Sequence, residues 1–284
     1  MTIQRALLNA ITTLRPVSTS ANLDAEVLLA FVLHKSKTWL LTNPNHTITS
    51  AQAARFRSLI QQRKKGMPVA YLIGHKEFYG LDFVVTKSVL VPRPETELLV
   101  ESVIHQAREL EKKIGAAKLR IADIGTGSGC IAISLAKYLP QSEIFASDIS
   151  ETALNIARKN ATTHKLMSRI TLLHGNLFSP YARVTKRKPL DIIVANLPYL
   201  HKEELANVKH EPRTALYGGK MGIEVIDRLL SRATHYLAPH GAILLEIAPA
   251  QAGAIEYAAK QQFPGKTIQI IQDLSKRDRV IGIV

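Results

Sequence analysis

From about residue 120 onward, short apolar segments alternate with longer amphipathic ones, and this alternation limits the possible folds more than any other feature. The apolar segments predict strands at residues 120–124, 143–147, 170–174, 191–195, 242–247, 267–271 and 279–284. Helices are expected near residues 130–138, 151–160, 222–236 and 251–262. Strand–helix alternation is typical of a mostly parallel sheet that is covered by helices on both faces.

Only residues 272–278 separate the last two strand segments, which is too short for the helical crossover that parallel neighbours need. These two strands are therefore predicted to pair antiparallel. We expect an α/β fold with a doubly wound, seven-stranded, mostly parallel sheet of Rossmann-like type. The antiparallel hairpin at its end distinguishes this sheet from that of an ordinary dehydrogenase.

Residues 1–75 lack the alternation and show helical spacing instead, with Asn22 or Asp24 as a candidate helix cap. Because 284 residues exceed the usual length of one domain, we predict a separate helical domain at 1–75. Apolar residues around Gly80 predict a β-hairpin linker at 76–90. The α/β domain is then expected at 91–284.

The net charge of +14 is unevenly distributed, since residues 1–75 hold nine Lys or Arg against only Asp24 and Glu26. Such a surface attracts acidic proteins or nucleic acid. No run of about 18 uncharged apolar residues occurs, so no membrane span is expected. The single cysteine, Cys130, excludes a disulfide within the chain, and the opening residues lack the apolar region of a secretion signal. A cytoplasmic location is therefore expected.

A glycine-rich turn follows the first strand of the α/β unit and consists of Gly125, Thr126, Gly127, Ser128 and Gly129. Glycine lets the backbone turn sharply and approach a ligand closely. Asp148 directly follows the next strand segment, where a carboxylate can accept both hydroxyls of a ribose. These residues predict a nucleotide-like cofactor. An NAD site, a turn without a ligand and a purely capping role for Asp148 stay open at this point.

The fourth strand segment ends in a tetrapeptide of Asn196, Leu197, Pro198 and Tyr199. An amide nitrogen is a poor nucleophile because its lone pair is delocalised into the carbonyl. The Asn196 side-chain oxygen and the Leu197 carbonyl can each accept one of its hydrogens and so direct the lone pair at a methyl donor. Pro198 restricts Leu197 to extended conformations, and Tyr199 offers a flat face. The tetrapeptide predicts methylation of a planar nitrogen, unless it is a plain turn.

The sequence resembles the protein-(glutamine-N5) methyltransferases that modify peptide chain release factors, a family of class I S-adenosylmethionine-dependent enzymes. Matching motifs extend through nearly the whole chain, at residues 78–81, 91–97, 123–129, 146–150, 196–199, 246 and 277–280. The segment 91–97, Val-Pro-Arg-Pro-Glu-Thr-Glu, is the most specific, because it separates this family from general N6-adenine methyltransferases.

The resemblance implies methyl transfer from S-adenosyl-L-methionine to the side-chain amide nitrogen of the glutamine in the Gly-Gly-Gln motif of release factors, a modification in translation termination. Residues 1–75 would then recognise the release factor. The cofactor is expected at Gly125, Thr126, Gly127, Ser128, Gly129, Asp148, Asn176, Leu177 and Asn196. The glutamine is expected at Arg93 and at the catalytic residues Asn196, Leu197, Pro198 and Tyr199.

Two positions depart from the family pattern. Leu197 stands where the family has proline, and Asn176 stands where an acid is common. Because the expected contact uses the Leu197 backbone carbonyl, function should survive with a less restricted φ. Asn176 keeps an acceptor oxygen for adenine but lacks the charge, which is expected to weaken cofactor binding.

Two enzymatic alternatives remain: a DNA or RNA adenine-N6 methyltransferase, which uses the same tetrapeptide on a flipped base, and a ribosomal-protein glutamine methyltransferase. A basic RNA- or ribosome-binding adaptor is a non-enzymatic alternative. Direct nucleic-acid binding is not expected, because residues 1–75 lack an aromatic stacking platform, although the basic charge leaves it open. No metal is expected from the histidine and cysteine spacing. Residues 186–188 read as a solvated basic loop.

Overall fold

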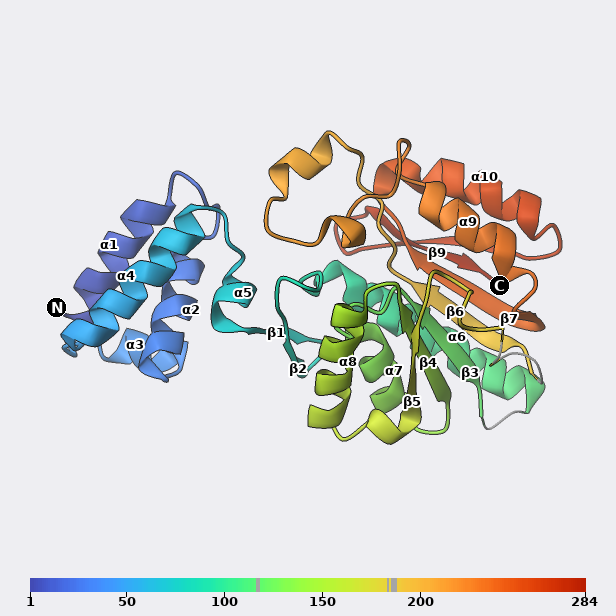
Figure 1. Cartoon of the computed structure of the whole chain (residues 1–284), viewed down its shortest axis with the longest axis horizontal. Helices are drawn as coiled ribbons and strands as arrows, with labels where there is room; N and C mark the ends of the chain where they lie inside the picture. Colours follow the sequence, from blue (N-terminus) through green and yellow to red (C-terminus); the bar gives the residue numbers. More distant parts are fainter. Residues whose placement is uncertain (116–117, 183, 185–187) are drawn as a thin grey trace. The chain divides into compact units, whose positions relative to one another are not determined.

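The computed structural model describes the whole chain except residues 116–117, 183 and 185–187. The predicted basic loop at 186–188 therefore lies largely outside the described residues. The chain divides into two compact units, Met1–His75 and Lys76–Val284. Figure 1 shows the elements of each unit. In the described part of the chain, no helix combines the length and the apolar character that crossing a membrane requires.

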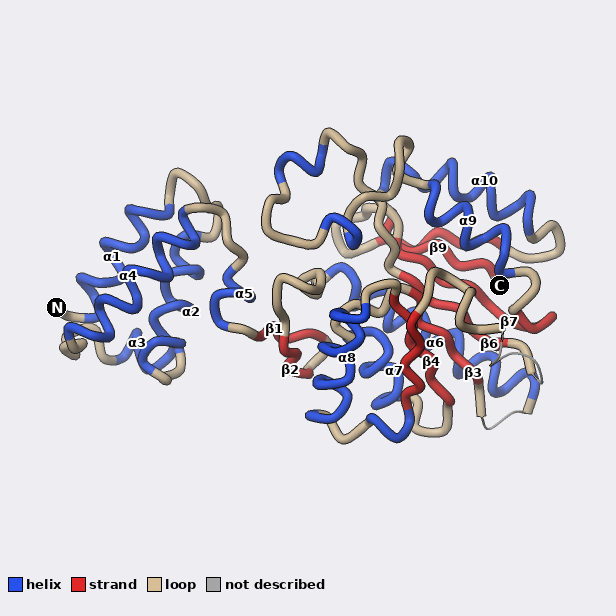
Figure 2. Tube along the Cα trace, in the orientation of Figure 1, coloured by secondary structure: helices blue, strands red, loops and turns tan. Residues whose placement is uncertain are grey.

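The first unit is helical, as predicted, and Figure 2 shows helices joined by loops throughout it. Its helices are α1 (Ile3–Leu14), α2 (Ala21–Leu33), α3 (Lys37–Thr42), α4 (Ser50–Lys64) and α5 (Val69–Ile73). Apolar residues at helical spacing, such as Leu28 of α2 and Phe56 of α4, form its buried core. Thr49 and Gln52 start α4 with a reciprocal capping box.

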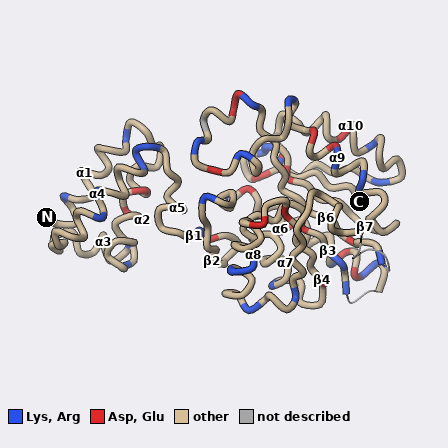
Figure 3. Tube along the Cα trace, in the orientation of Figure 1, with Lys and Arg blue, Asp and Glu red and all other residues tan. Residues whose placement is uncertain are grey.

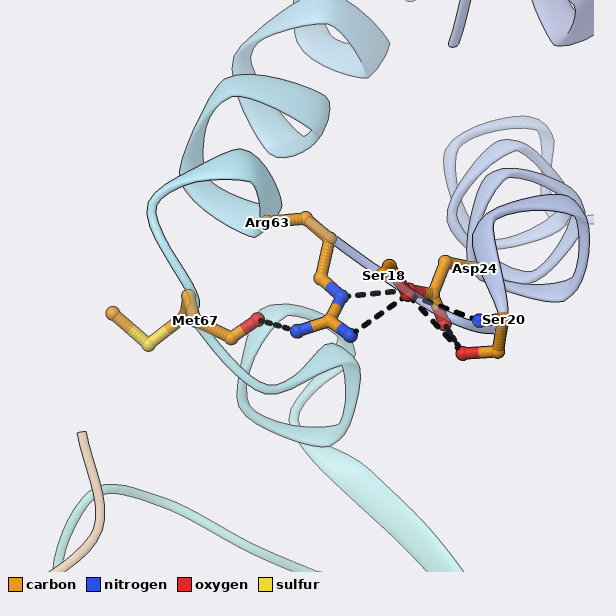
Figure 4. A network of polar contacts seen from close by, with 5 residues as sticks. All are labelled: Ser18, Ser20, Asp24, Arg63 and Met67. Atoms are coloured by element: carbon orange, nitrogen blue, oxygen red, sulfur yellow. Dashed lines mark hydrogen bonds and ion pairs between the residues drawn. The ribbon is translucent and has the colours of Figure 1, made fainter. Parts of the chain in front are cut away.

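The prediction that Asn22 or Asp24 caps α2 was wrong, because the N-cap position is Ser20 and Asp24 lies in the first turn. The Asp24 carboxylate is buried instead, and Figure 4 shows its partners. It accepts hydrogen bonds from Ser18 Oγ (2.7 Å), Ser20 Oγ (3.0 Å) and Arg63 Nε (2.7 Å). A buried charge needs such partners, since an unpaired one is very costly. This network joins the start of α2 to the end of α4.

The charge of the first unit remains strongly positive at its surface. Its two acids both lie on α2, whereas the basic residues are spread over other helices and loops (Figure 3). Arg63 is partly buried in the ion pair with Asp24, and the other eight Lys and Arg residues are exposed. This unit therefore presents a basic surface of the kind that attracts acidic partners.

The second unit contains the predicted seven-stranded sheet. Its strands are β3 (Arg120–Ile124), β4 (Glu143–Asp148), β5 (Ile170–His174), β6 (Leu190–Ala195), β7 (Leu237–Glu246), β8 (Ile268–Gln272) and β9 (Asp278–Ile283). They lie in the order β5-β4-β3-β6-β7-β9-β8. The pairs from β5 to β7 are parallel, and β9 pairs antiparallel with both β7 and β8. The expected α/β fold and its antiparallel hairpin are thus confirmed.

Helices cover both faces of the sheet (Figure 1). Successive residues of a strand point to opposite faces, so each strand contributes side chains to two cores. Ile121 packs in one core with α6 (Glu95–Ile114) and α7 (Cys130–Tyr138). Ala122 packs in the other with α9 (Glu224–Ala233) and α10 (Ala252–Gln262). The remaining helices are α8 (Glu151–Thr163) and the 3-10 turns η1 (Met167–Arg169), η2 (Glu204–Asn207), η3 (Arg213–Ala215) and η4 (Pro249–Gln251).

The predicted hairpin around Gly80 consists of β1 (His75–Phe78) and β2 (Leu81–Val84). Tyr79 and Gly80 form its turn with φ of 51° and 70°. Phe78 and Phe83 are buried in the same core as α6 and α7. The hairpin therefore packs onto the α/β unit, and it leads into the Pro-rich loop before α6.

Candidate active site

A cavity of about 640 Å³ lies at the carboxyl ends of β3, β4 and β6, a volume in the range of about 300–1,000 Å³ that is usual for small-molecule sites. The structure brings most of the predicted site residues to its wall: Arg93, Gly125, Thr126, Gly127, Ser128, Asp148, Asn176, Leu177, Asn196, Leu197 and Pro198. Within the described chain, the lining does not include Gly129 or Tyr199. The carboxyl edge of an open α/β sheet is where such folds bind ligands.

The three glycines of the turn after β3 serve different purposes. All have positive φ: 80° at Gly125, 56° at Gly127 and 82° at Gly129. A Cβ on Gly129 would lie 3.2 Å from the Ala157 Cβ of α8, so this glycine allows close helix packing and does not face the cavity. A Cβ on Gly125 would lie 3.1 Å from Leu197 Cδ2. A Cβ on Gly127 would meet no described atom within 4 Å, which leaves open space for a ligand.

Asp148 joins the glycine turn to the end of β4. Its Oδ2 accepts the Gly127 N–H at 2.9 Å, and its Oδ1 accepts the Ser150 N–H at 2.8 Å. Burial raises the pKa of Asp148, and these backbone hydrogen bonds oppose the rise. The N-cap of α8 is Ser150, whose Oγ accepts the Ala153 N–H, so capping this helix is not the role of Asp148. The carboxylate keeps acceptor capacity for a ligand hydroxyl beside its backbone donors.

Asp123, which the sequence reasoning did not assign to the site, supports the turn from inside the fold. Its Oδ2 accepts hydrogen bonds from Thr126 Oγ1 at 2.6 Å and from the Ala132 N–H at 3.1 Å. Burial raises its pKa to about 7, although these two hydrogen bonds act in the opposite direction. The side chain thereby connects the end of β3 to both the turn and α7.

The tetrapeptide after β6 is held by side chains from other elements. Asn196 Nδ2 donates to Thr96 Oγ1 of α6 at 3.1 Å, so the amide nitrogen has a protein partner. Gln251 Nε2 donates to the Tyr199 carbonyl at 3.0 Å. The Leu197 side chain is buried in the sheet core, and the residue also lines the cavity. The flat face proposed for Tyr199 stays a prediction.

Arg93 is tied to a loop that follows the tetrapeptide. Its Nη2 lies 2.5 Å from Glu211 Oε2, and Glu211 Oε1 accepts the Val91 N–H at 3.0 Å. Glu211 is buried, so these hydrogen bonds replace the water that its carboxylate loses. Arg93 lines the cavity, and so does Pro212, the residue after Glu211. Glu211 therefore holds two walls of the cavity together.

Sequence reasoning also missed Thr96 and Gln251 as site residues, and it noted Glu246 only as part of a family motif. Glu246 is buried at the end of β7. An acid that ends an apolar strand on the same sheet edge as Asn196 was the signal available in the sequence. In the described ranges, no cluster of three His, Cys, Asp or Glu side chains is arranged to hold a metal ion.

The sheet order, the glycine turn and the acid at the end of the neighbouring strand define a methyltransferase of class I. The hMettl16 catalytic domain, solved in complex with MAT2A 3′UTR hairpin 1, shares this fold with a TM-score of 0.56 at 18% identity, over 86% of this chain and 84% of that one. Residues 5–74 match the PrmC N-terminal domain, and residues 96–212 match the Methyltransferase small domain.

Curated relatives narrow the class to one family. The release factor glutamine methyltransferase of Moorella thermoacetica is 39% identical over 284 residues, which cover 98% of this chain and 97% of the relative. That of Rhodopirellula baltica is 38% identical and covers 94% and 90%. The chain belongs to the release factor glutamine methyltransferase family, and the resemblance seen in the sequence is confirmed.

Proposed function

We propose that this protein transfers the methyl group of S-adenosylmethionine to the side-chain amide nitrogen of a glutamine in a peptide chain release factor. The observation that carries the proposal is a single cavity with two kinds of wall. The glycine turn and Asp148 form one side, and Asn196, Leu197 and Pro198 form the other. A methyl-transfer site needs one wall that holds the methyl donor and an adjacent wall that holds the amide to be methylated.

The residues of the first wall fit S-adenosylmethionine. Asp148 has acceptor capacity for the ribose hydroxyls, and the open space beside Gly127 can take the amino-acid part. Asn176 and Leu177 line the same cavity and would flank the adenine. When bound, the cofactor supplies a methyl group on a positively charged sulfur.

The second wall prepares the glutamine amide for attack. Asn196 Oδ1 and the Leu197 carbonyl would each accept one amide hydrogen, which directs the nitrogen lone pair into the cavity. Loss of one such acceptor would cost about 1–3 kcal/mol, as for other buried hydrogen bonds. No general base is needed, because the proton can leave after the new N–C bond has formed. Positioning then provides most of the rate acceleration.

The helical unit of residues 1–75 is proposed to recognise the release factor. Eight of its Lys and Arg side chains are exposed, and both of its acids lie on α2. An acidic partner surface would be attracted to it, and the rate of encounter would fall as salt screens the charges.

The proposed function is tested with methyl-labelled S-adenosylmethionine and three acceptors: a release factor, the same factor with its Gly-Gly-Gln glutamine replaced by alanine, and a DNA and RNA mixture. We expect label only in the intact release factor, on the glutamine, located by mass spectrometry of its peptides. Label that appears only in nucleic acid would favour the adenine-N6 alternative and overturn the proposal.

The cofactor assignment predicts that Asp148→Ala weakens S-adenosylmethionine binding at least about tenfold, because hydrogen bonds to a charged group contribute about 1.5–3 kcal/mol. Isothermal titration calorimetry measures the change. Glu143→Gln, at the other end of the same strand β4, is the matched control and should bind as the unaltered protein does. An Asp148→Ala affinity within twofold of the original would show that the carboxylate does not hold the ribose.

A further inference from the structure

We propose that Thr96 and Glu246 are positioning residues that determine which end of the Asn196 carboxamide faces the substrate. This inference rests on the proposed function, because it gives Thr96 and Glu246 a role only through the acceptor oxygen of Asn196. It assigns to both residues a part in the reaction that requires no contact with the reacting atoms.

The fold brings the three side chains together from distant parts of the sequence. Strands β6 and β7 are parallel neighbours in which Ala195 pairs with Leu245, so Asn196 and Glu246 are the next residues along the two strands. Thr96 lies in the first turn of α6, which packs against both strands. Thr96 and Glu246 are each only 2% exposed. Water therefore has little access to orient the Asn196 amide in their place.

The chemistry of the three groups allows one orientation. Asn196 Nδ2 donates to Thr96 Oγ1 at 3.1 Å. A hydroxyl has a single hydrogen, and the buried Glu246 Oε2 has no hydrogen-bond partner among the described residues. Thr96 and Asn196 lie close enough to this carboxylate for both side chains to favour its ionised form. An ionised carboxylate only accepts. The NH2 end of Asn196 is therefore turned toward Thr96 and Glu246, and its Oδ1 is left for the substrate.

The opposite orientation of the amide would be unfavourable on both sides. Asn196 Oδ1 would face the Glu246 carboxylate, where two acceptors repel each other. The NH2 group would then face the NH2 group of the substrate glutamine, where two donors cannot pair. An amide with free rotation would spend part of its time in this unproductive state. Since an amide flip leaves the shape of the side chain unchanged, only its hydrogen-bond partners can select the orientation.

The groups around Glu246 partly offset the cost of burying the charge that an acceptor role requires. Burial raises the pKa of its carboxyl group to about 7, while the hydrogen bond from Thr96 and the positive charge of Arg279 favour the ionised form. Glu95 is the nearby acid that acts against ionisation, and the Asn196 hydrogen bond acts for it. The interactions of Glu246 with Thr96 and Asn196 favour the charged carboxylate, and the same interactions turn the NH2 end of Asn196 toward it.

The test compares Thr96→Val, which keeps the shape but removes the hydroxyl, with Thr96→Ser, which keeps the hydroxyl. Thr96→Val should lower kcat for glutamine methylation at least about tenfold, while the affinity for S-adenosylmethionine stays within threefold. Thr96→Ser should retain kcat within threefold. Glu246→Gln should resemble Thr96→Val, and the double variant should be no slower than the slower single one, because both act through Asn196.

A second readout is independent of turnover. The side-chain ¹⁵N–¹H2 resonances of Asn196, identified as the pair missing in Asn196→Ala, should shift in Thr96→Val and exchange faster with solvent. They should remain near their original positions in Thr96→Ser. Equal behaviour of the Val and Ser variants in this spectrum would overturn the positioning role. If the unaltered protein methylated no glutamine, the proposed function would fail, whereas the spectrum would still decide whether Thr96 orients Asn196.

Discussion

Replacement of Asn196 by alanine is expected to lower kcat for glutamine methylation at least about a hundredfold, a loss comparable to removal of one preorganised hydrogen-bonding group from other active sites. The physical reason is that, in the proposed reaction, Asn196 Oδ1 accepts an amide hydrogen of the substrate while its Nδ2 donates a hydrogen bond to Thr96. Alanine has no side-chain acceptor, so the lone pair of the substrate nitrogen would no longer be directed at the methyl donor. S-adenosylmethionine affinity should stay within about threefold, because Asp148 and the glycine turn are untouched.

Single-turnover rates and calorimetric titration separate these two effects of Asn196→Ala. The control is Asn155→Ala on the exposed face of α8, where the side chain bonds only Arg158 among the described residues. That variant should keep both kcat and cofactor affinity. A collapse of cofactor binding in Asn196→Ala, equal in size to the loss of rate, would mean that Asn196 holds the cofactor and not the glutamine.

Replacement of Asn160 by leucine is expected to lower the free energy of unfolding of the α/β unit by at least about 3 kcal/mol. Asn160 is 1% exposed on α8. Its Oδ1 accepts the Val84 N–H at 2.8 Å, and its Nδ2 donates to the carbonyls of Val84 at 3.0 Å and of Ser128 at 2.8 Å. Leucine has a similar shape but would leave three backbone groups without partners, each at a cost of about 1–3 kcal/mol.

The loss in Asn160→Leu is measured by urea unfolding followed by far-ultraviolet circular dichroism, with Asn155→Leu on the exposed face of α8 as the control. The control should change the free energy of unfolding by less than about 0.5 kcal/mol. Cofactor affinity should also fall in Asn160→Leu, because Asn160 joins the hairpin strand β2 to Ser128 of the glycine turn. A destabilisation below about 1 kcal/mol would show that these hydrogen bonds are replaced when the amide is removed.

The strands were predictable because each carries its own local pattern. The predicted strand at 120–124 coincides with β3, and the predicted helix at 130–138 coincides with α7. Long apolar runs with glycine turns between them leave few alternatives for a parallel sheet. The helix cap on α2 was mispredicted, because Asp24 has the residue type of a cap but finds a stronger partner in Arg63, 39 positions away.

The family and the positions of the glycine turn, Asp148 and Asn196 follow from sequence alone, since they are contiguous motifs at strand ends, and strand ends meet at one edge of a parallel sheet. Tertiary structure alone decided that Gly129 serves helix packing and that Glu211 joins two walls of the cavity. It also decided that Thr96 bonds Asn196 across 100 positions of sequence. Such hydrogen bonds depend on strand register and on how α6 packs against the sheet, which no local pattern encodes.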